Sequence, residues 1–265
     1  MVFKTKQFLY KKENIYLKRG FVYTTNMDEN LSISREPIRI LKAKDYVFIT
    51  LVIGLFFTCA LIIICGLTWD FVCNKVGFEK GLTRELVEAF TRAALIEELF
   101  KFLGFFIAYK KYKINHVAVS MFTCGCFGLI YAVVEKFATF SVIAIVLGLV
   151  FPMHILWQLN SGRHFQQFID AKKEGKKGKA FFEFMMATFF IYIMHGVWDA
   201  VISLIQYAKE DSPFTIVAII FFIILMIAGV AYTIISFIKT IKTWIAYKKE
   251  VKALKENEAK ENSAN

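Results

Sequence analysis

The stretch Ala93-Ala94-Leu95-Ile96-Glu97-Glu98-Leu99-Phe100-Lys101-Phe102 places two adjacent carboxylates and a lysine inside an apolar run. A charged side chain at the middle of a bilayer costs roughly 2.5–3.5 kcal/mol on insertion scales. We therefore expect these three side chains to face a protein interior or a wet cavity and to have partners there. Glu97 and Glu98 stand four and three residues before Lys101, so each can pair with the lysine on a helix.

Composition places this stretch in a membrane protein. The chain has 265 residues, 57% of them hydrophobic, and apolar runs of about 20 residues recur, which is the length that crosses a hydrocarbon core of about 30 Å. The alternating pattern of a membrane β-barrel is not seen. The predicted fold class is an all-α, polytopic protein of the cell membrane with about six transmembrane helices. The expected spans are 46–67, 83–109, 117–137, 140–159, 181–206 and 214–238.

The net charge of +11 is concentrated between and beyond the apolar runs, in residues 1–45, 110–116, 160–180 and 239–265. This pattern follows the positive-inside rule and argues against a nucleic-acid partner. It predicts that both termini are cytoplasmic and that anionic lipids contact this face, at about 1 kcal/mol per basic residue. The expected organisation is an N-terminal arm (1–45), a transmembrane domain (46–239) and a cytoplasmic tail (240–265) that frays as a helix. Residues 160–180 are expected to form a basic connection.

Four more polar residues stand in apolar segments and are candidate partners of the first cluster: Glu135, His154, His195 and Asp199. His195 and Asp199 share a helix face, so the carboxylate can orient the imidazole. Glu135 is also compatible with a place at the membrane edge, and a lone histidine such as His154 is often only a packing residue. The five cysteines are interpreted as structural. On the expected spans Glu135 lies near the outer end of its helix and His154 in the cytoplasmic half, so a single cluster requires the third helix to be shifted or tilted.

Four motifs follow one another within residues 85–205: Glu97-Glu98-x-x-Lys101, Tyr131 through Glu135, His154, and His195-Gly196-Val197-Trp198-Asp199. In this ordered set the chain resembles the PrsW family of intramembrane proteases, part of the superfamily of CAAX prenyl proteases and bacteriocin-immunity proteins. Lys136 stands where that family usually has asparagine. The prenyl-protease branch is less similar, because it has arginine where this chain has Phe102.

The resemblance implies hydrolysis of a peptide bond in a membrane-embedded protein, with an anti-sigma factor as one candidate substrate. Glu97 or Glu98 would activate water, and Glu135 would share or orient that water. His154 and His195 would stabilise the oxyanion or move the proton, Asp199 would fix the tautomer of His195, and Lys101 would balance the carboxylates.

Two questions stay open at this point. Glutamates and histidines can hold zinc with an open position for water, although we favour a mechanism without a cofactor. Buried acids with histidines also form proton relays, so a proton- or ion-coupled transporter is the alternative function. A third possible function is that of an inactive protein that binds a membrane partner.

Overall fold

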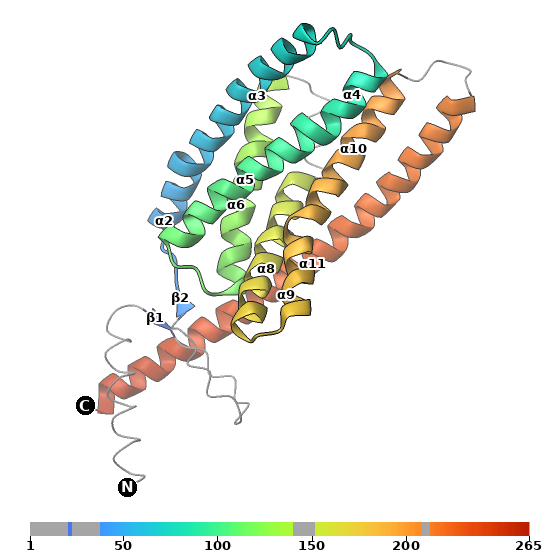
Figure 1. Cartoon of the computed structure of the whole chain (residues 1–265). Helices are drawn as coiled ribbons and strands as arrows, with labels where there is room; N and C mark the ends of the chain where they lie inside the picture. Colours follow the sequence, from blue (N-terminus) through green and yellow to red (C-terminus); the bar gives the residue numbers. More distant parts are fainter. Residues whose placement is uncertain (1–20, 23–37, 140–151, 208–212, 265) are drawn as a thin grey trace.

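The computed structural model describes residues 21–22, 38–139, 152–207 and 213–264. Within these ranges the chain is all-α, apart from a two-residue antiparallel pair of β1 (Phe21–Val22) and β2 (Ile38–Arg39). The helical elements are α2 (Ala43–Phe48), η1 (Ile49–Gly54), α3 (Leu55–Lys75), α4 (Leu82–Glu88), η2 (Ala89–Ile96), α5 (Glu97–Lys111), α6 (Val117–Thr139), α8 (Met153–Lys173), α9 (Lys177–Ala187), α10 (Phe189–Tyr207) and α11 (Pro213–Ala264). They form a bundle (Figure 1).

Several of these elements join end to end, which leaves six helices in the described part of the chain. The π-helical turns η1 and η2 connect α2 to α3 and α4 to α5, and α9 and α10 form one helix broken at Thr188. Four helices are long and apolar enough to cross a membrane: Ala43–Lys75, Val117–Glu135, Lys177–Ile205 and Ile219–Asn257. Four such helices are typical of a multi-pass membrane protein.

Two of the six expected spans are not among these four. The helix Leu82–Lys111 is long, but charged residues in its first half and the motif Glu97-Glu98-x-x-Lys101 lower its hydropathy. Most of the expected span 140–159 lies outside the described residues. Its described end belongs to α8, which is amphiphilic rather than apolar because it carries polar side chains such as Gln158 and Asn160.

The prediction of a basic connection over residues 160–180 is wrong for most of this range, because the chain there is helical. Helix α8 continues to Lys173, and α9 begins at Lys177. The connection is closed by Gly175, whose φ of +71° is the left-handed conformation typical of a helix end. Its N–H donates to the carbonyl of Lys172 at 3.1 Å, and that of Lys176 donates to Ala171 at 2.9 Å. The basic side chains therefore decorate a tight helical hairpin.

The expected C-terminal tail is also part of a helix. Helix α11 runs without interruption across residue 240, and Trp244, Val251 and Leu254 pack against the buried core. Tyr247 is buried, and its ring centroid lies 4.9 Å from that of His116. The second half of α11 is thus held against the connection between α5 and α6.

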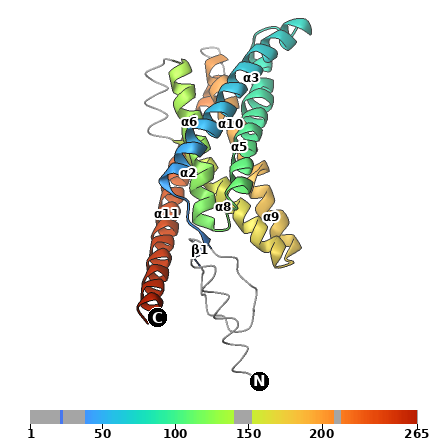
Figure 2. The same cartoon turned by 90° about the vertical axis from the view of Figure 1, so that its left-hand side faces the viewer.

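The basic connections lie at one end of the bundle. Figures 1 and 2 both show the connection from α5 to α6, the connection from α8 to α9 and the C-terminal end of α11 at the same end. The opposite end carries the connection between α3 and α4 and the end of α10. This arrangement agrees with the charge asymmetry of the sequence.

Helices α6 and α8 approach closely because two glycines lie between them. A Cβ atom added at Gly128 would stand 2.3 Å from the carbonyl oxygen of His154, and one at Gly162 would stand 2.5 Å from that of Ser120. Gly196 of α10 similarly accommodates the ring of Phe90. Gly104 and Gly125 also face close neighbours, as expected for packing contacts, whereas Gly148 lies outside the described residues.

Candidate functional site

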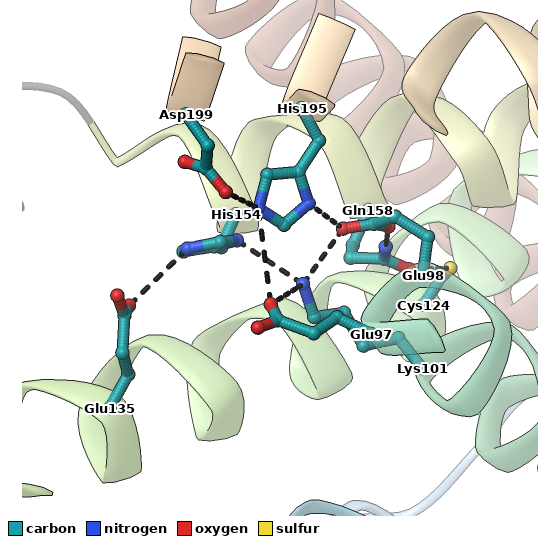
Figure 3. A network of polar contacts seen from close by, with 9 residues as sticks. All are labelled: Glu97, Glu98, Lys101, Cys124, Glu135, His154, Gln158, His195 and Asp199. Carbon is teal, nitrogen blue, oxygen red and sulfur yellow. Dashed lines mark hydrogen bonds and ion pairs between the residues drawn. The ribbon is translucent and has the colours of Figure 1, made fainter. Parts of the chain in front are cut away.

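The carboxylate of Glu98 is the centre of a buried polar network (Figure 3). Its Oε1 atom lies 2.8 Å from Lys101 Nζ and 2.8 Å from His195 Nδ1, and its Oε2 atom accepts a hydrogen bond from Gln158 Nε2. The side chains of Glu98, Lys101 and His195 are only 9%, 4% and 3% exposed. Three elements, α5, α8 and α10, therefore meet at one carboxylate.

His195 has a carboxylate on each side of its ring. Its Nδ1 atom faces Glu98, while its Nε2 atom lies 3.2 Å from Asp199 Oδ2 and 3.9 Å from Glu97 Oε2. Because both nitrogens face acceptors, this geometry suits a doubly protonated imidazolium, in which both nitrogens donate. The spacing of His195 and Asp199 on α10 brings the two side chains onto one face, as the sequence predicts.

His154 links the lysine to a further carboxylate. Its Nδ1 atom lies 3.2 Å from Lys101 Nζ, and its Nε2 atom lies 3.3 Å from Glu135 Oε2. An ammonium only donates, so Nδ1 is the acceptor and Nε2 carries the proton that points to Glu135. Glu135 is 32% exposed, which places it at the border of the network rather than in its centre.

Glu97 is held more loosely than Glu98. Its Oε2 atom lies 3.7 Å from Lys101 Nζ, and it receives a hydrogen bond from Tyr131. The ring of Tyr131 also covers the lysine, whose Nζ atom lies 3.9 Å from the ring centroid. Adjacent residues on an α-helix diverge by about 100°, and the two glutamates accordingly occupy different sides of the lysine.

The seven candidate residues of the sequence form one network of contacts: Glu97, Glu98, Lys101, Glu135, His154, His195 and Asp199. The expected spans predicted that Glu135 and His154 lie at different depths in the membrane. This prediction is wrong. Helix α8 begins at Met153, so His154 lies in its first turn and not in the second half of a span from 140 to 159. The last turns of α6 pack beside that first turn, and Glu135 therefore reaches His154.

Sequence reasoning missed Gln158 as a member of this network. Its amide donates to Glu98, and its oxygen accepts from the Cys124 thiol at 3.1 Å. A signal was present, because Gln158 stands one helical turn after His154 and on the same face. Trp157 was missed as well, and its ring centroid lies 5.1 Å from that of His195. The histidines outside the network pair with glutamates elsewhere, His116 with Glu250 and His164 with Glu183.

An apolar cavity of about 430 Å³ borders Glu98 and is called here the Glu98 cavity. It lies between α5, α8 and the break that separates α9 from α10. Its lining residues are Leu95, Glu98, Leu99, Phe102, Gln158, Ser161, Phe184, Met185, Ala187, Thr188, Phe189, Ile191 and Tyr192. Among them Glu98 alone is charged. Leu95, Leu99 and Phe189 are about half exposed, so the cavity opens toward the apolar outer face of the bundle.

Three side chains of the network could in principle bind a metal ion. Glu98, His154 and His195 each offer one ligand atom, and these atoms lie within 4.8 Å of one another. However, Lys101 Nζ is in hydrogen-bond contact with both Glu98 and His154. The ammonium stands where a cation bound to these two residues would be, and two positive charges there would repel each other. As arranged, the residues fit the lysine and not an additional zinc ion.

No family model, no curated protein and no solved structure matches this chain.

Proposed function

We propose that this protein is an intramembrane peptidase in which Glu98 activates the attacking water. The observation that carries the proposal is that Glu98 belongs both to the buried network and to the wall of the Glu98 cavity. A carboxylate offers about four acceptor positions, and Lys101, His195 and Gln158 use three of those of Glu98. One position is left to accept a hydrogen bond from a water molecule in the cavity.

The reaction is hydrolysis of an amide. Glu98 takes a proton from the water, and the water oxygen bonds to the carbonyl carbon of the substrate. The resulting oxyanion needs a donor, for which Lys101 and His195 are the cationic groups beside Glu98. The C–N bond then breaks, and the proton held by Glu98 passes to the leaving amine. Each proton and bond is thereby accounted for without a cofactor.

The other residues position this group. Asp199 holds the ring of His195 so that Nδ1 faces Glu98. Glu135 holds His154, whose Nδ1 atom in turn faces Lys101. Such contacts fix side chains in a reactive geometry and prevent them from turning to alternative partners.

The substrate we propose is a membrane-spanning protein segment. The exposed Leu95 and Leu99 at the mouth of the cavity belong to an apolar surface that would face lipid. A segment already in the bilayer can therefore reach Glu98 sideways, without leaving the hydrocarbon. An anti-sigma factor anchored by one span is a candidate of this kind.

The test compares Glu98→Gln with Glu97→Gln in purified protein that is offered a single-span membrane substrate. Loss of a general base costs about 10²–10⁴-fold in rate, and we expect this loss for Glu98→Gln. Glu97→Gln should lose less, because Glu97 lies farther from Lys101 and does not line the cavity. A strong chelator should leave the wild-type rate unchanged.

The unfolding temperature of each variant is the control for loss of folding. This control is needed because the amide of Glu98→Gln faces the donors Lys101, His195 and Gln158, and its NH₂ group cannot accept from them. Glu98→Asp is the second variant, because it keeps the charge but withdraws it from the cavity. Equal activity of wild type and both glutamine variants would refute the proposal, and rescue by zinc after chelation would replace it with a metal-dependent mechanism.

The break at Thr188 favours one alternative, a proton- or ion-coupled transporter, because interrupted helices form the substrate sites of many transporters. We rank it second, since the cavity beside this break is lined almost entirely by apolar side chains. Proton or cation flux into liposomes that contain the protein, abolished by Glu98→Gln, would favour the transporter.

A further inference from the structure

We propose that the Glu98 cavity is the subsite for a bulky apolar side chain of the substrate, next to the peptide bond that is cut. The inference rests on the peptidase function proposed above and adds to it a rule of sequence preference. It predicts cleavage beside leucine, isoleucine or phenylalanine rather than beside a small residue.

The size and walls of the cavity support a bulky occupant. Its volume of about 430 Å³ lies within the range of binding pockets, roughly 300–1,000 Å³. Four aromatic rings line it, contributed by Phe102, Phe184, Phe189 and Tyr192. A small side chain such as alanine would leave most of this apolar surface without contacts, and empty apolar space is unfavourable.

Three of the polar side chains in the wall, Gln158, Ser161 and Thr188, already make hydrogen bonds within the protein. The Ser161 hydroxyl donates to the carbonyl of Ala187 at 2.7 Å, and the Thr188 hydroxyl donates to that of Phe184 at 2.8 Å. The Gln158 amide donates to Glu98. The hydroxyl hydrogens of Ser161 and Thr188 are therefore not directed to an occupant, and a polar or charged side chain would lose its hydration in a cavity that is lined mostly by apolar side chains.

The position of Glu98 in the wall ties the occupant to the reaction. A water activated by Glu98 must stand about 3–3.5 Å from the carbonyl carbon that it attacks. The side chain attached beside that carbonyl is then within a few ångströms of Glu98, and the cavity is the apolar space available there. The subsite thus selects the residue that flanks the cleaved bond.

The first experiment measures cleavage of single-span model peptides that differ only at the flanking residue. Leucine or phenylalanine should be preferred over alanine in kcat/KM by roughly 10-fold or more, since a pocket distinguishes one methylene by about 10–200-fold. In Leu99→Trp, an indole added from the exposed mouth should fill the cavity and reduce or reverse this preference. Leu103→Trp is the matched control, because Leu103 is similarly exposed one turn later on α5 but does not line the cavity.

The second experiment does not depend on turnover. Model peptides with a benzophenone-bearing phenylalanine at the flanking position are irradiated with the Glu98→Gln variant in nanodiscs, and the crosslinked residues are mapped by mass spectrometry. Crosslinks to Leu99, Phe184 or Met185 that disappear in Leu99→Trp show that the cavity holds an apolar side chain of the peptide. If these crosslinks form but no peptide is cleaved, the peptidase function fails and the cavity is only a binding site.

The remaining outcomes overturn the inference. Cleavage that ignores the flanking side chain, or that responds alike to Leu99→Trp and Leu103→Trp, leaves a peptidase whose subsite lies elsewhere. Co-purified lipid that is lost from Leu99→Trp, without peptide crosslinks in the cavity, would identify the space as a lipid site instead.

Discussion

Lys101 provides the positive charge around which the buried carboxylates are arranged. Its ammonium contacts Glu98, His154 and, at a longer distance, Glu97, and it also lies over the ring of Tyr131. Desolvated ions of this kind are stable only with several well-placed partners. The lysine is therefore as necessary to the network as the glutamate that we propose as the base.

This role gives a prediction for Lys101→Met. The substitution leaves two adjacent glutamates buried without their ammonium, and breaking a buried ion pair costs roughly 3–5 kcal/mol. We expect a clear fall in the unfolding temperature in detergent. The double variant Glu98→Gln/Lys101→Met should recover part of the loss, because one of the stranded charges is gone. A double variant less stable than Lys101→Met would show that the lysine does not act through Glu98.

Much of the network was predictable at the level of residues. A carboxylate or imidazole in an apolar run must find partners, and this requirement singles out Glu98, His195 and Asp199 from the sequence alone. The sequence does not predict which of the two glutamates is the better candidate for the general base, because this depends on which of them borders a cavity. Gln158 was missed because an uncharged amide in a helix carries a weaker signal than a charge.

At the scale of elements, the contact between α6 and α8 sets the position of His154. Gly128 allows the backbone of α8 to approach at the residue whose side chain contacts Lys101. The displacement that a larger residue requires would be transmitted directly to His154, because the close atom is the carbonyl oxygen of that residue.

Gly128→Ala should therefore destabilise the protein by roughly 1–3 kcal/mol, the usual range for overpacking, and should lower activity. Gly66→Ala is the matched control, since no atom would contact a Cβ at this helical glycine. There the gain in helix propensity predicts a stabilisation of roughly 0.5–1 kcal/mol. Thermal unfolding and cleavage are measured for both variants. Similar behaviour of the two would argue against close packing at Gly128.

The elements were only partly predictable. Apolar length was sufficient to predict α3, α6 and the first part of α11. The break at Thr188 was not predictable from the sequence, because no proline or glycine marks it. The π-helical turn η2 was also not predictable from periodicity, although it immediately precedes Glu97.

At the scale of the whole molecule, the common end of the basic connections supports a defined orientation. We expect reporters fused near residues 112, 175 and 255 to lie in the cytoplasm, because positively charged connections are retained there. A reporter near residue 78, in the connection between α3 and α4, should lie on the other side. A reporter at 175 on the outer face would contradict this topology.

The contact between α11 and the start of α6 predicts a dependence on pH. The Ala118 N–H donates to His116 Nδ1 at 3.1 Å, so the imidazole is neutral and its Nε2 atom donates to Glu250. Burial lowers the pKa of His116, against the opposing effects of Glu250 and Asp170. The pKa in the folded state is thus below the unfolded value of about 6.5, and stability is lost as the pH falls from that value toward the folded pKa.

Thermal unfolding between pH 8 and pH 5 tests this contact. Wild type should lose stability on acidification through the unfolded pKa of His116. His116→Gln, which keeps a donor for Glu250 but does not titrate, should lose less. Tyr247 lies beside the ring, and burial raises its pKa above the usual value, so it does not titrate between pH 8 and pH 5. Parallel curves for the two proteins would mean that His116 is not the sensitive group.

Helix α11 has 52 residues, which at about 1.5 Å per residue makes it roughly 78 Å long. A hydrocarbon core of about 30 Å covers less than half of this length. The rest of the helix extends beyond the hydrocarbon core, and the contacts of Tyr247 and Glu250 with His116 hold it against the bundle. A flexible tail of the same length would let its end wander over a wide volume. A continuous helix instead fixes the distance and direction of its last residues relative to the membrane. A protein fused to this helix would therefore be held at a defined position.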